Sequence, residues 1–397
     1  MIDRGTAAFR RIALTMVLAG FTTFATLYGV QPLLPLFSDA FHVSPAAAGL
    51  SMSATTMSMA IGMLGIGAIS DLWSRKRWMT VSLLASAALS LLLSLSPNFP
   101  ALLLLRVLQG FTLAALPAIA MTYLSEEIAP TSLGYAMGLY ISGNSLGGML
   151  GRLLSGAITD WLGWPAAMFF LGVLGVASGI LFSLLLPPSA YDAKRSLQRG
   201  PLLTTVVDAL RQRELLLLFG MGFGLMGCFV CLFNYIGFHL SEAPYRLSQT
   251  WLGWIFSVYL AGTFSSTWMG KQSVKHGMGT MMLSGVLLMI VGSVLTLHAS
   301  LPVIIAGLAI FSFGFFGSHS IASSWVGRIA GELKAQASSL YLFFYYIGSS
   351  VIGAFGGTFW SAYDWGGIVL LILVILLPSL LVSLKMTKRQ SKAGRMG

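Results

Sequence analysis

The chain has 397 residues, of which 56% are hydrophobic and only 9% are charged. Soluble domains carry about 25% charged residues because their surface faces water, so this composition excludes a soluble globular protein. The net charge of +11 would suit a nucleic-acid partner, but the placement of the basic residues indicates a membrane topology and no nucleic acid.

Apolar runs bounded by charges, prolines or polar turns predict twelve transmembrane helices, and hence an all-α membrane protein. The first run follows a short basic segment and is longer than the core of a signal peptide, so we expect an uncleaved span. In chain order the predicted spans are 12–37, 46–69, 78–96, 101–124, 135–158, 165–186, 215–240, 249–270, 278–297, 303–325, 336–360 and 366–384.

A long polar connection divides these spans six and six. It predicts an N-terminal six-helix half (1–186), a cytoplasmic linker (187–214) and a C-terminal six-helix half with a short basic tail (215–397). An internal repeat supports this division, because Leu139-Tyr140, Gly147, Gly156 and Trp164 recur 201 positions later as Leu340-Tyr341, Gly348, Gly357 and Trp365. Two similar, pseudo-symmetric halves are a transporter design with the solute site near the middle of the membrane.

The lysines and arginines fix the predicted orientation. All but three of the 23 fall in the termini, the linker and alternate loops, and the exceptions are Arg106, Arg152 and Arg246. Because basic residues favour the cytoplasmic side, we expect both termini to be cytoplasmic in a multi-pass bacterial inner-membrane protein.

Three motifs lie in the first half. The loop between spans two and three reads G-A-I-S-D-L-W-S-R-K-R over residues 67–77, in which Gly67 allows close helix packing and Asp71 precedes Arg75 and Lys76. Span four carries R-x-x-Q-G at Arg106, Gln109 and Gly110. Span five carries a glycine series at Gly143, Gly147 and Gly151.

These motifs resemble those of the major facilitator superfamily, whose loop motif is G-x-L-A-D-R-x-G-R-K. The glycine series is similar to that family's antiporter motif G-x-x-x-G-P-x-x-G-G, with Gly148 in place of proline and Arg152 in place of the last glycine. The resemblance covers the whole chain. It is greatest for the bacterial drug and sugar efflux branch and, over residues 121–127 and span five, for inner-membrane proteins of the YnfM type.

The resemblance implies a monomer that moves solute in exchange for protons, with the proton gradient as energy source and no cofactor. It also implies that Asp71 pairs with cations at a cytoplasmic gate. The chain lacks a glycine-rich phosphate loop followed by lysine and serine or threonine, so the sequence does not predict ATP drive.

None of the 12 carboxylates falls at mid-depth of a predicted span, which disfavours a selective pump for cationic drugs. Proton coupling remains open through a group at the rim, Asp39 or Glu127, or through Arg106 or His319 inside a span. His319 is the histidine placed well inside a span, and imidazole changes charge near neutral pH. A histidine that only packs and hydrogen-bonds is the alternative.

Arg106 and Arg152 are cations inside predicted spans, where an ionisable group marks a functional site by default. Two guanidinium groups would hold a carboxylate or phosphate. Alternatively, Arg106 bonds to helix carbonyls and Arg152 reaches outward toward Asp160. Polar and aromatic residues on predicted inner helices complete the candidate solute site, namely Tyr28, Gln31, Asn144, Asn234, Tyr235, Tyr345 and Tyr346.

Cys228 and Cys231 form a C-x-x-C inside an apolar run without a neighbouring acid or histidine, so we expect two packed side chains and no metal or redox site. Pro32, Pro35 and Pro117 predict bends in spans one and four.

The leading hypothesis is secondary active efflux of a small organic solute by alternating access. The alternatives within transport are uptake of an organic anion by a proton symporter or uniporter, and a lipid flippase. A membrane-embedded enzyme would need a nucleophile with its base, or clustered acids and histidines, near a membrane face. The sequence shows neither, so we expect a transporter and no catalytic residues.

Overall fold

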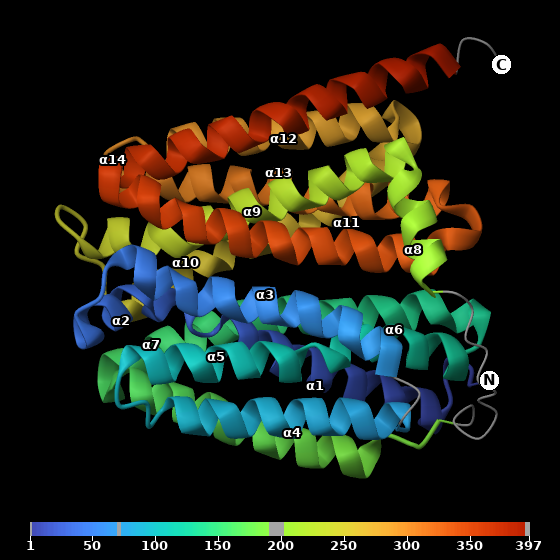
Figure 1. Ribbon diagram of the computed structural model, residues 1–397, viewed down its shortest axis with the longest axis horizontal. Helices are drawn as coiled ribbons and strands as arrows, with labels where there is room; N and C mark the ends of the chain where they lie inside the picture. Colours follow the sequence, from blue (N-terminus) through green and yellow to red (C-terminus); the bar gives the residue numbers. More distant parts are fainter. Residues whose placement is uncertain (1, 70–72, 190–201, 394–397) are drawn as a thin grey trace. The chain divides into compact units, whose positions relative to one another are not determined.

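The computed structural model describes residues 2–69, 73–189 and 202–393. This part of the chain is helical and contains no strand (Figure 1). In chain order its elements are α1 (Ala7–Tyr28), η1 (Gln31–Leu33), α2 (Leu34–Phe41), α3 (Pro45–Ile69), α4 (Arg75–Leu93), α5 (Phe99–Leu113), α6 (Ala115–Glu127), α7 (Pro130–Leu185), α8 (Leu202–Arg211), α9 (Arg213–Ser241), α10 (Gln249–Ile255), η3 (Phe256–Val258), α11 (Tyr259–His276), α12 (Met278–Leu295), α13 (Leu301–Ile329), η4 (Gly331–Leu333) and α14 (Lys334–Ala393).

Within the described residues, nine helical segments are long and apolar enough to cross a membrane. Two of them, α7 with 56 residues and α14 with 60, are about twice the length that a bilayer needs. Each contains a break, so each supplies two spans. The span predicted at 249–270 forms α10, η3 and α11. The helices are therefore consistent with the predicted twelve spans, and the chain is a multi-pass membrane protein.

The breaks in α7 and α14 follow the internal repeat. Gly163 has a φ of 82° and interrupts α7, while Asp364 has a φ of 50° and interrupts α14. Glycine adopts this left-handed region without steric cost, and aspartate tolerates it better than most residues do. The two positions are 201 residues apart, which is the spacing of the repeat in the sequence.

Prolines divide two predicted spans. Span one ends as α1 at Tyr28, continues as η1 with Pro32 in its first turn, and resumes as α2. Span four is split into α5 and α6 around Ala114, three residues before Pro117. A proline lacks the N–H that would extend the helix and crowds the preceding turn, so these bends agree with the prediction.

The described helices group into two compact units. Unit 1 holds residues 1–43, 54–198 and 247–254, and unit 2 holds 44–53, 199–246 and 255–397. Each unit thus includes a short segment from the other half of the sequence. The start of α3 belongs to unit 2, and most of α10 belongs to unit 1.

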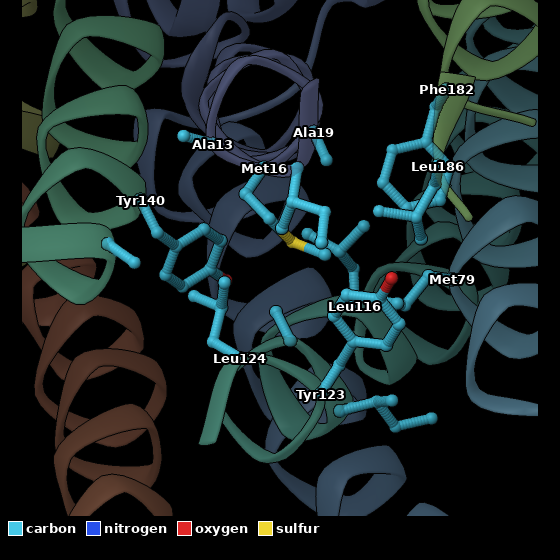
Figure 2. Close-up of a cluster of buried hydrophobic side chains, with 14 of the residues drawn as sticks. Ala13, Met16, Ala19, Met79, Leu116, Tyr123, Leu124, Tyr140, Phe182 and Leu186 are labelled. Carbon is cyan, nitrogen blue, oxygen red and sulfur yellow. The ribbon is translucent and has the colours of Figure 1, made fainter. Parts of the chain in front are cut away.

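The core of unit 1 is a cluster of buried side chains from α1, α4, α6 and α7. Met16, Leu116 and Tyr123 lie in its middle, and Tyr140 and Phe182 lie toward its sides (Figure 2). The hydroxyl of Tyr123 donates to the carbonyl of Pro187 at 2.9 Å. This bond ties the start of the linker to the core.

Glycines set the distance between α1 and α7. A Cβ added at Gly143 would lie 2.5 Å from the carbonyl oxygen of Val17, and one added at Gly147 would clash with that of Phe21. Unit 2 repeats the arrangement, because a Cβ at Gly348 in α14 would clash with the carbonyl oxygen of Phe223 in α9. Small residues let membrane helices approach until their backbones touch, so each unit is built around one such helix pair.

Candidate functional site

Arg152 projects from α7 toward the end of α1 in unit 1. Its guanidinium lies 4.3 Å from the centre of the Tyr28 ring. Its Nε donates to the side-chain oxygen of Gln31 at 2.8 Å, and another nitrogen donates to the carbonyl of Gly148. The helix ends after Tyr28 and turns through η1, which places Gln31 opposite the arginine. The sequence predicted these three site residues, and the structure brings them together.

The Arg152 side chain is only 2% exposed. Burying a charge without partners is costly. The amide of Gln31 and the carbonyl of Gly148 offset that cost by accepting hydrogen bonds, and the Tyr28 ring offsets it by a cation–π contact. Arg152 does not reach toward Asp160, as the structural alternative supposed. Its guanidinium therefore lies among the ring of Tyr28, the amide of Gln31 and the carbonyl of Gly148.

Arg106 has a different environment on α5. It donates to the carbonyl of Leu27 at 3.0 Å and to the side chain of Gln109, and it is fully buried. Gln109 in turn donates to the hydroxyl of Ser90 at 2.8 Å. A Cβ at Gly110 would clash with the backbone of α3 at Thr55. The R-x-x-Q-G motif therefore joins α1, α3, α4 and α5. This agrees with the alternative in which Arg106 bonds to helix carbonyls.

Asp160 lies near the end of the first segment of α7, where it accepts hydrogen bonds from α10. Its two carboxylate oxygens accept from the backbone N–H of Gln249 at 2.9 Å and of Thr250 at 2.8 Å. Helix N-termini carry unpaired N–H groups and a partial positive charge, so a carboxylate stabilises them. Close packing supports the contact, because a Cβ at Gly156 would clash with the carbonyl of Gln249.

The loop motif is only partly described. Gly67 belongs to α3, and Asp71 lies outside the described residues, so its predicted pairing stays a prediction. Arg75 forms an ion pair with Glu126 at the end of α6, and Lys76 lies in the first turn of α4. Glu126 is a partner that sequence reasoning did not assign to this motif.

The two rim carboxylates proposed for proton coupling occupy different environments. Asp39 is exposed near the end of α2. Glu127 is 6% exposed and accepts a hydrogen bond from the hydroxyl of Ser189 at 2.7 Å. The backbone carbonyl of Glu127 also accepts a hydrogen bond, at 2.8 Å, from the N–H of Ile2 near the N-terminus.

His319 forms the candidate site of unit 2, on α13. Its Nδ1 lies 2.9 Å from the hydroxyl of Tyr341. Its ring stacks with Phe315 at 5.9 Å between ring centres, and it lies at a tilt of 37° to the ring of Tyr345, 4.6 Å away. Tyr346 meets Tyr345 edge to face at 5.2 Å. The structure thus brings together three predicted site residues, His319, Tyr345 and Tyr346.

The remaining predicted site residues lie at helix contacts. The hydroxyl of Tyr235 donates to the carbonyl of Gly353 at 3.3 Å, and Asn234 beside it is 1% exposed. Both pack between α9 and α14. Asn144 lies against Gly20 of α1, where an added Cβ would clash with its amide oxygen. These contacts fit helix packing, which was the alternative for each residue.

Tyr341 is the site residue that sequence reasoning missed. It was recognised as the repeat partner of Tyr140 but not as a partner of His319. Its spacing held a signal, because Tyr341 and Tyr345 are four residues apart and share one face of a helix. The two cysteines are free and buried, and the Cys228 thiol lies 3.7 Å from the carbonyl of Ile372. Within the described residues no group of acids, histidines and cysteines could hold a metal ion.

The family model described as Major Facilitator Superfamily matches residues 16–350. The chain is 48% identical over 382 residues to the uncharacterized MFS-type transporter YybF of Bacillus subtilis, covering 96% of this chain and 95% of that protein. It is 44% identical to the inner membrane transport protein YnfM of Escherichia coli, covering 98% and 93%.

Solved structures share the fold at low sequence identity. A bacterial homologue of the human lysosomal transporter Spinster, in an inward-facing and unoccupied conformation, superposes with a TM-score of 0.79 at 16% identity and covers 96% of this chain and 98% of that one. A variant of the nucleoside transporter NupG superposes with a TM-score of 0.75 at 14% identity, covering 94% and 98%.

Proposed function

Because the chain belongs to the major facilitator superfamily and is a secondary transporter of that kind, not an enzyme, we propose that it exports a small organic solute in exchange for protons. Transport proceeds by alternating access in the bacterial inner membrane, with both termini cytoplasmic, in a monomer that needs no cofactor.

The packing of α7 on α1 is the observation that supports exchange of solute for protons. Gly143, Gly147 and Gly151 lie at successive turns of α7, and an added Cβ at each would press on the backbone of α1. This is the glycine series that resembles the antiporter motif. Arg152, one residue beyond it, holds Tyr28 and Gln31 at the end of α1. The motif and the candidate site therefore form one continuous contact, so that α1 and α7 would move together.

Uptake of an organic anion is the second candidate. It is favoured by the place of a buried guanidinium, that of Arg152, beside the predicted site residues Tyr28 and Gln31. Arg106 gives this candidate less support, because its guanidinium is bonded to Gln109 and to the backbone of α1.

The test measures internal pH in proteoliposomes under an imposed proton gradient while candidate organic anions, cations and sugars are added. Proton release triggered by a solute, and absent from protein-free vesicles, supports exchange. Labelled solute that crosses without proton movement would overturn the antiporter proposal in favour of a uniporter. Movement of a fluorescent lipid between leaflets, with no soluble substrate, would favour a flippase.

A further inference from the structure

His319 has one ring nitrogen in a hydrogen bond and one that is open. Its Nδ1 contacts the Tyr341 hydroxyl at 2.9 Å. Its Nε2 has no hydrogen-bond partner among the described residues. This nitrogen is not fully buried, and the side chain as a whole is partly exposed. In a membrane protein an imidazole N–H that faces lipid without a hydrogen-bond partner would be costly. The open nitrogen is therefore suited to a polar partner such as water or a solute group.

The Tyr341 hydroxyl determines which nitrogen carries the proton. Tyr341 is 1% exposed, and Nδ1 of His319 is the partner that the described residues offer to its hydroxyl. A buried O–H that does not donate loses the energy of a hydrogen bond, so the hydroxyl donates and Nδ1 accepts. A neutral imidazole with an accepting Nδ1 carries its proton on Nε2. The open nitrogen is then a hydrogen-bond donor.

Aromatic rings surround this donor. His319 is nearly parallel to Phe315, with 6° between the ring planes, and Phe315 stacks on Phe229 of α9 with ring centres 3.9 Å apart. Phe315 and Phe229 are buried, whereas Tyr345 is half-buried like His319 and lies 4.6 Å from it. The buried rings make a fixed support, and the partly exposed rings of His319 and Tyr345 lie beside one another.

We propose that His319 and Tyr345 bind a planar aromatic solute that carries an acceptor oxygen, a carbonyl or a carboxylate. The Nε2–H of His319 donates to that oxygen, and the solute ring packs on Tyr345 by offset or edge-to-face contact. The inference rests on the proposed function and names the class of solute. A cationic group without an acceptor oxygen would face the N–H donor and would be rejected.

The experiment is calorimetric titration of the purified full-length protein in detergent with three probes. The first is 2-naphthoate, which has rings and a carboxylate. The second is decahydro-2-naphthoate, which keeps the carboxylate without aromatic faces. The third is 2-naphthylmethylammonium, which keeps the rings with a cation. We expect 2-naphthoate to bind at least about tenfold more tightly than either of the others, from the loss of a charge-assisted hydrogen bond or of a stacking contact.

Variants assign the binding to the two residues. His319→Phe keeps a ring and removes the donor, so affinity for 2-naphthoate should fall about tenfold to a hundredfold. Tyr345→Leu should lower it about threefold to tenfold, while Tyr345→Phe stays within about threefold of wild type. Tyr363→Leu, at an exposed ring beside the break in α14, is the matched control. The melting temperature of each variant verifies that it is folded.

Three results would overturn the inference. They are equal affinity for the aromatic and saturated carboxylates, unchanged affinity in folded His319→Phe, and absence of saturable binding for all three probes. Binding needs no proton gradient, so its outcome is separate from that of proton exchange. If 2-naphthoate binds as expected but moves no protons in vesicles, the solute class stands and the antiport proposal fails.

Discussion

At the scale of single residues, the two buried arginines show why a side chain in the sequence does not reveal its role. Both are charged groups inside spans, and both were candidates for contact with an anion. Arg106 is bonded to the backbone at Leu27, whereas Arg152 is held by the ring of Tyr28 and the amide of Gln31. The difference depends on the bend after Tyr28, whose geometry no single-sequence pattern specifies.

Arg152→Met should destabilise the protein. The substitution removes the hydrogen bonds that the guanidinium donates to the side-chain oxygen of Gln31 and to the carbonyl of Gly148, at a cost of about 1–3 kcal/mol in free energy of unfolding. The measurement is the apparent melting temperature in detergent. Lys275→Met, which removes an exposed charge from α11, is the control and should have little effect. Equal melting temperatures for the two variants would show that the guanidinium does not hold the end of α1.

At the scale of elements, apolar runs predicted the helices well because a span must bury about 20 residues in lipid. The bends at Pro32 and Pro117 were also predictable, since proline acts locally. The division of span eight into α10, η3 and α11 was not, because residues 249–258 contain no proline or other strong local signal for a break. The contact between Asp160 and α10 joins segments about 90 residues apart, so it too was hidden from sequence reasoning.

Gly147→Ala and Gly348→Ala should each destabilise the protein, because the new methyl group would clash with the carbonyl of Phe21 or Phe223 and force the paired helices apart. Overpacking of this kind costs about 1–3 kcal/mol. Gly138→Ala is the matched control on α7, where nothing lies within 4 Å of an added Cβ. It should be neutral or stabilising, since alanine favours helix more than glycine does. Melting temperatures that do not separate Gly147→Ala from Gly138→Ala would contradict the role of the glycine series.

At the scale of the whole molecule, the repeat of 201 residues was readable from Tyr140, Gly147 and Trp164 and their later copies. The structure adds that both the close helix pair and the break recur at that spacing. What the sequence could not supply is the chemistry of each candidate site. The repeat spacing pairs Arg152 with Gly353 and His319 with Ala118, so the two candidate sites occupy positions that the repeat does not relate.

Both termini should be cytoplasmic, since the basic residues cluster in the termini, the linker and alternate loops. A fluorescent protein that folds only in the cytoplasm, fused after Gly397, should fluoresce. Alkaline phosphatase, which is active only outside the cytoplasm, should be active when inserted in the exposed turn at 242–244 between α9 and α10. The opposite pattern of activities would invert the topology and with it the proposed direction of transport.

The exchange of short segments between the two units bears on attempts to produce the transporter in pieces. Unit 1 includes residues 247–254, which a fragment ending at the linker would lack. In such a fragment the carboxylate of Asp160 would lose the two backbone donors of α10, and the surface at Gly156 would lose its covering helix. A separately made C-terminal half would likewise lack residues 44–53 of its unit, so complementation would depend on each half receiving a peptide from the other.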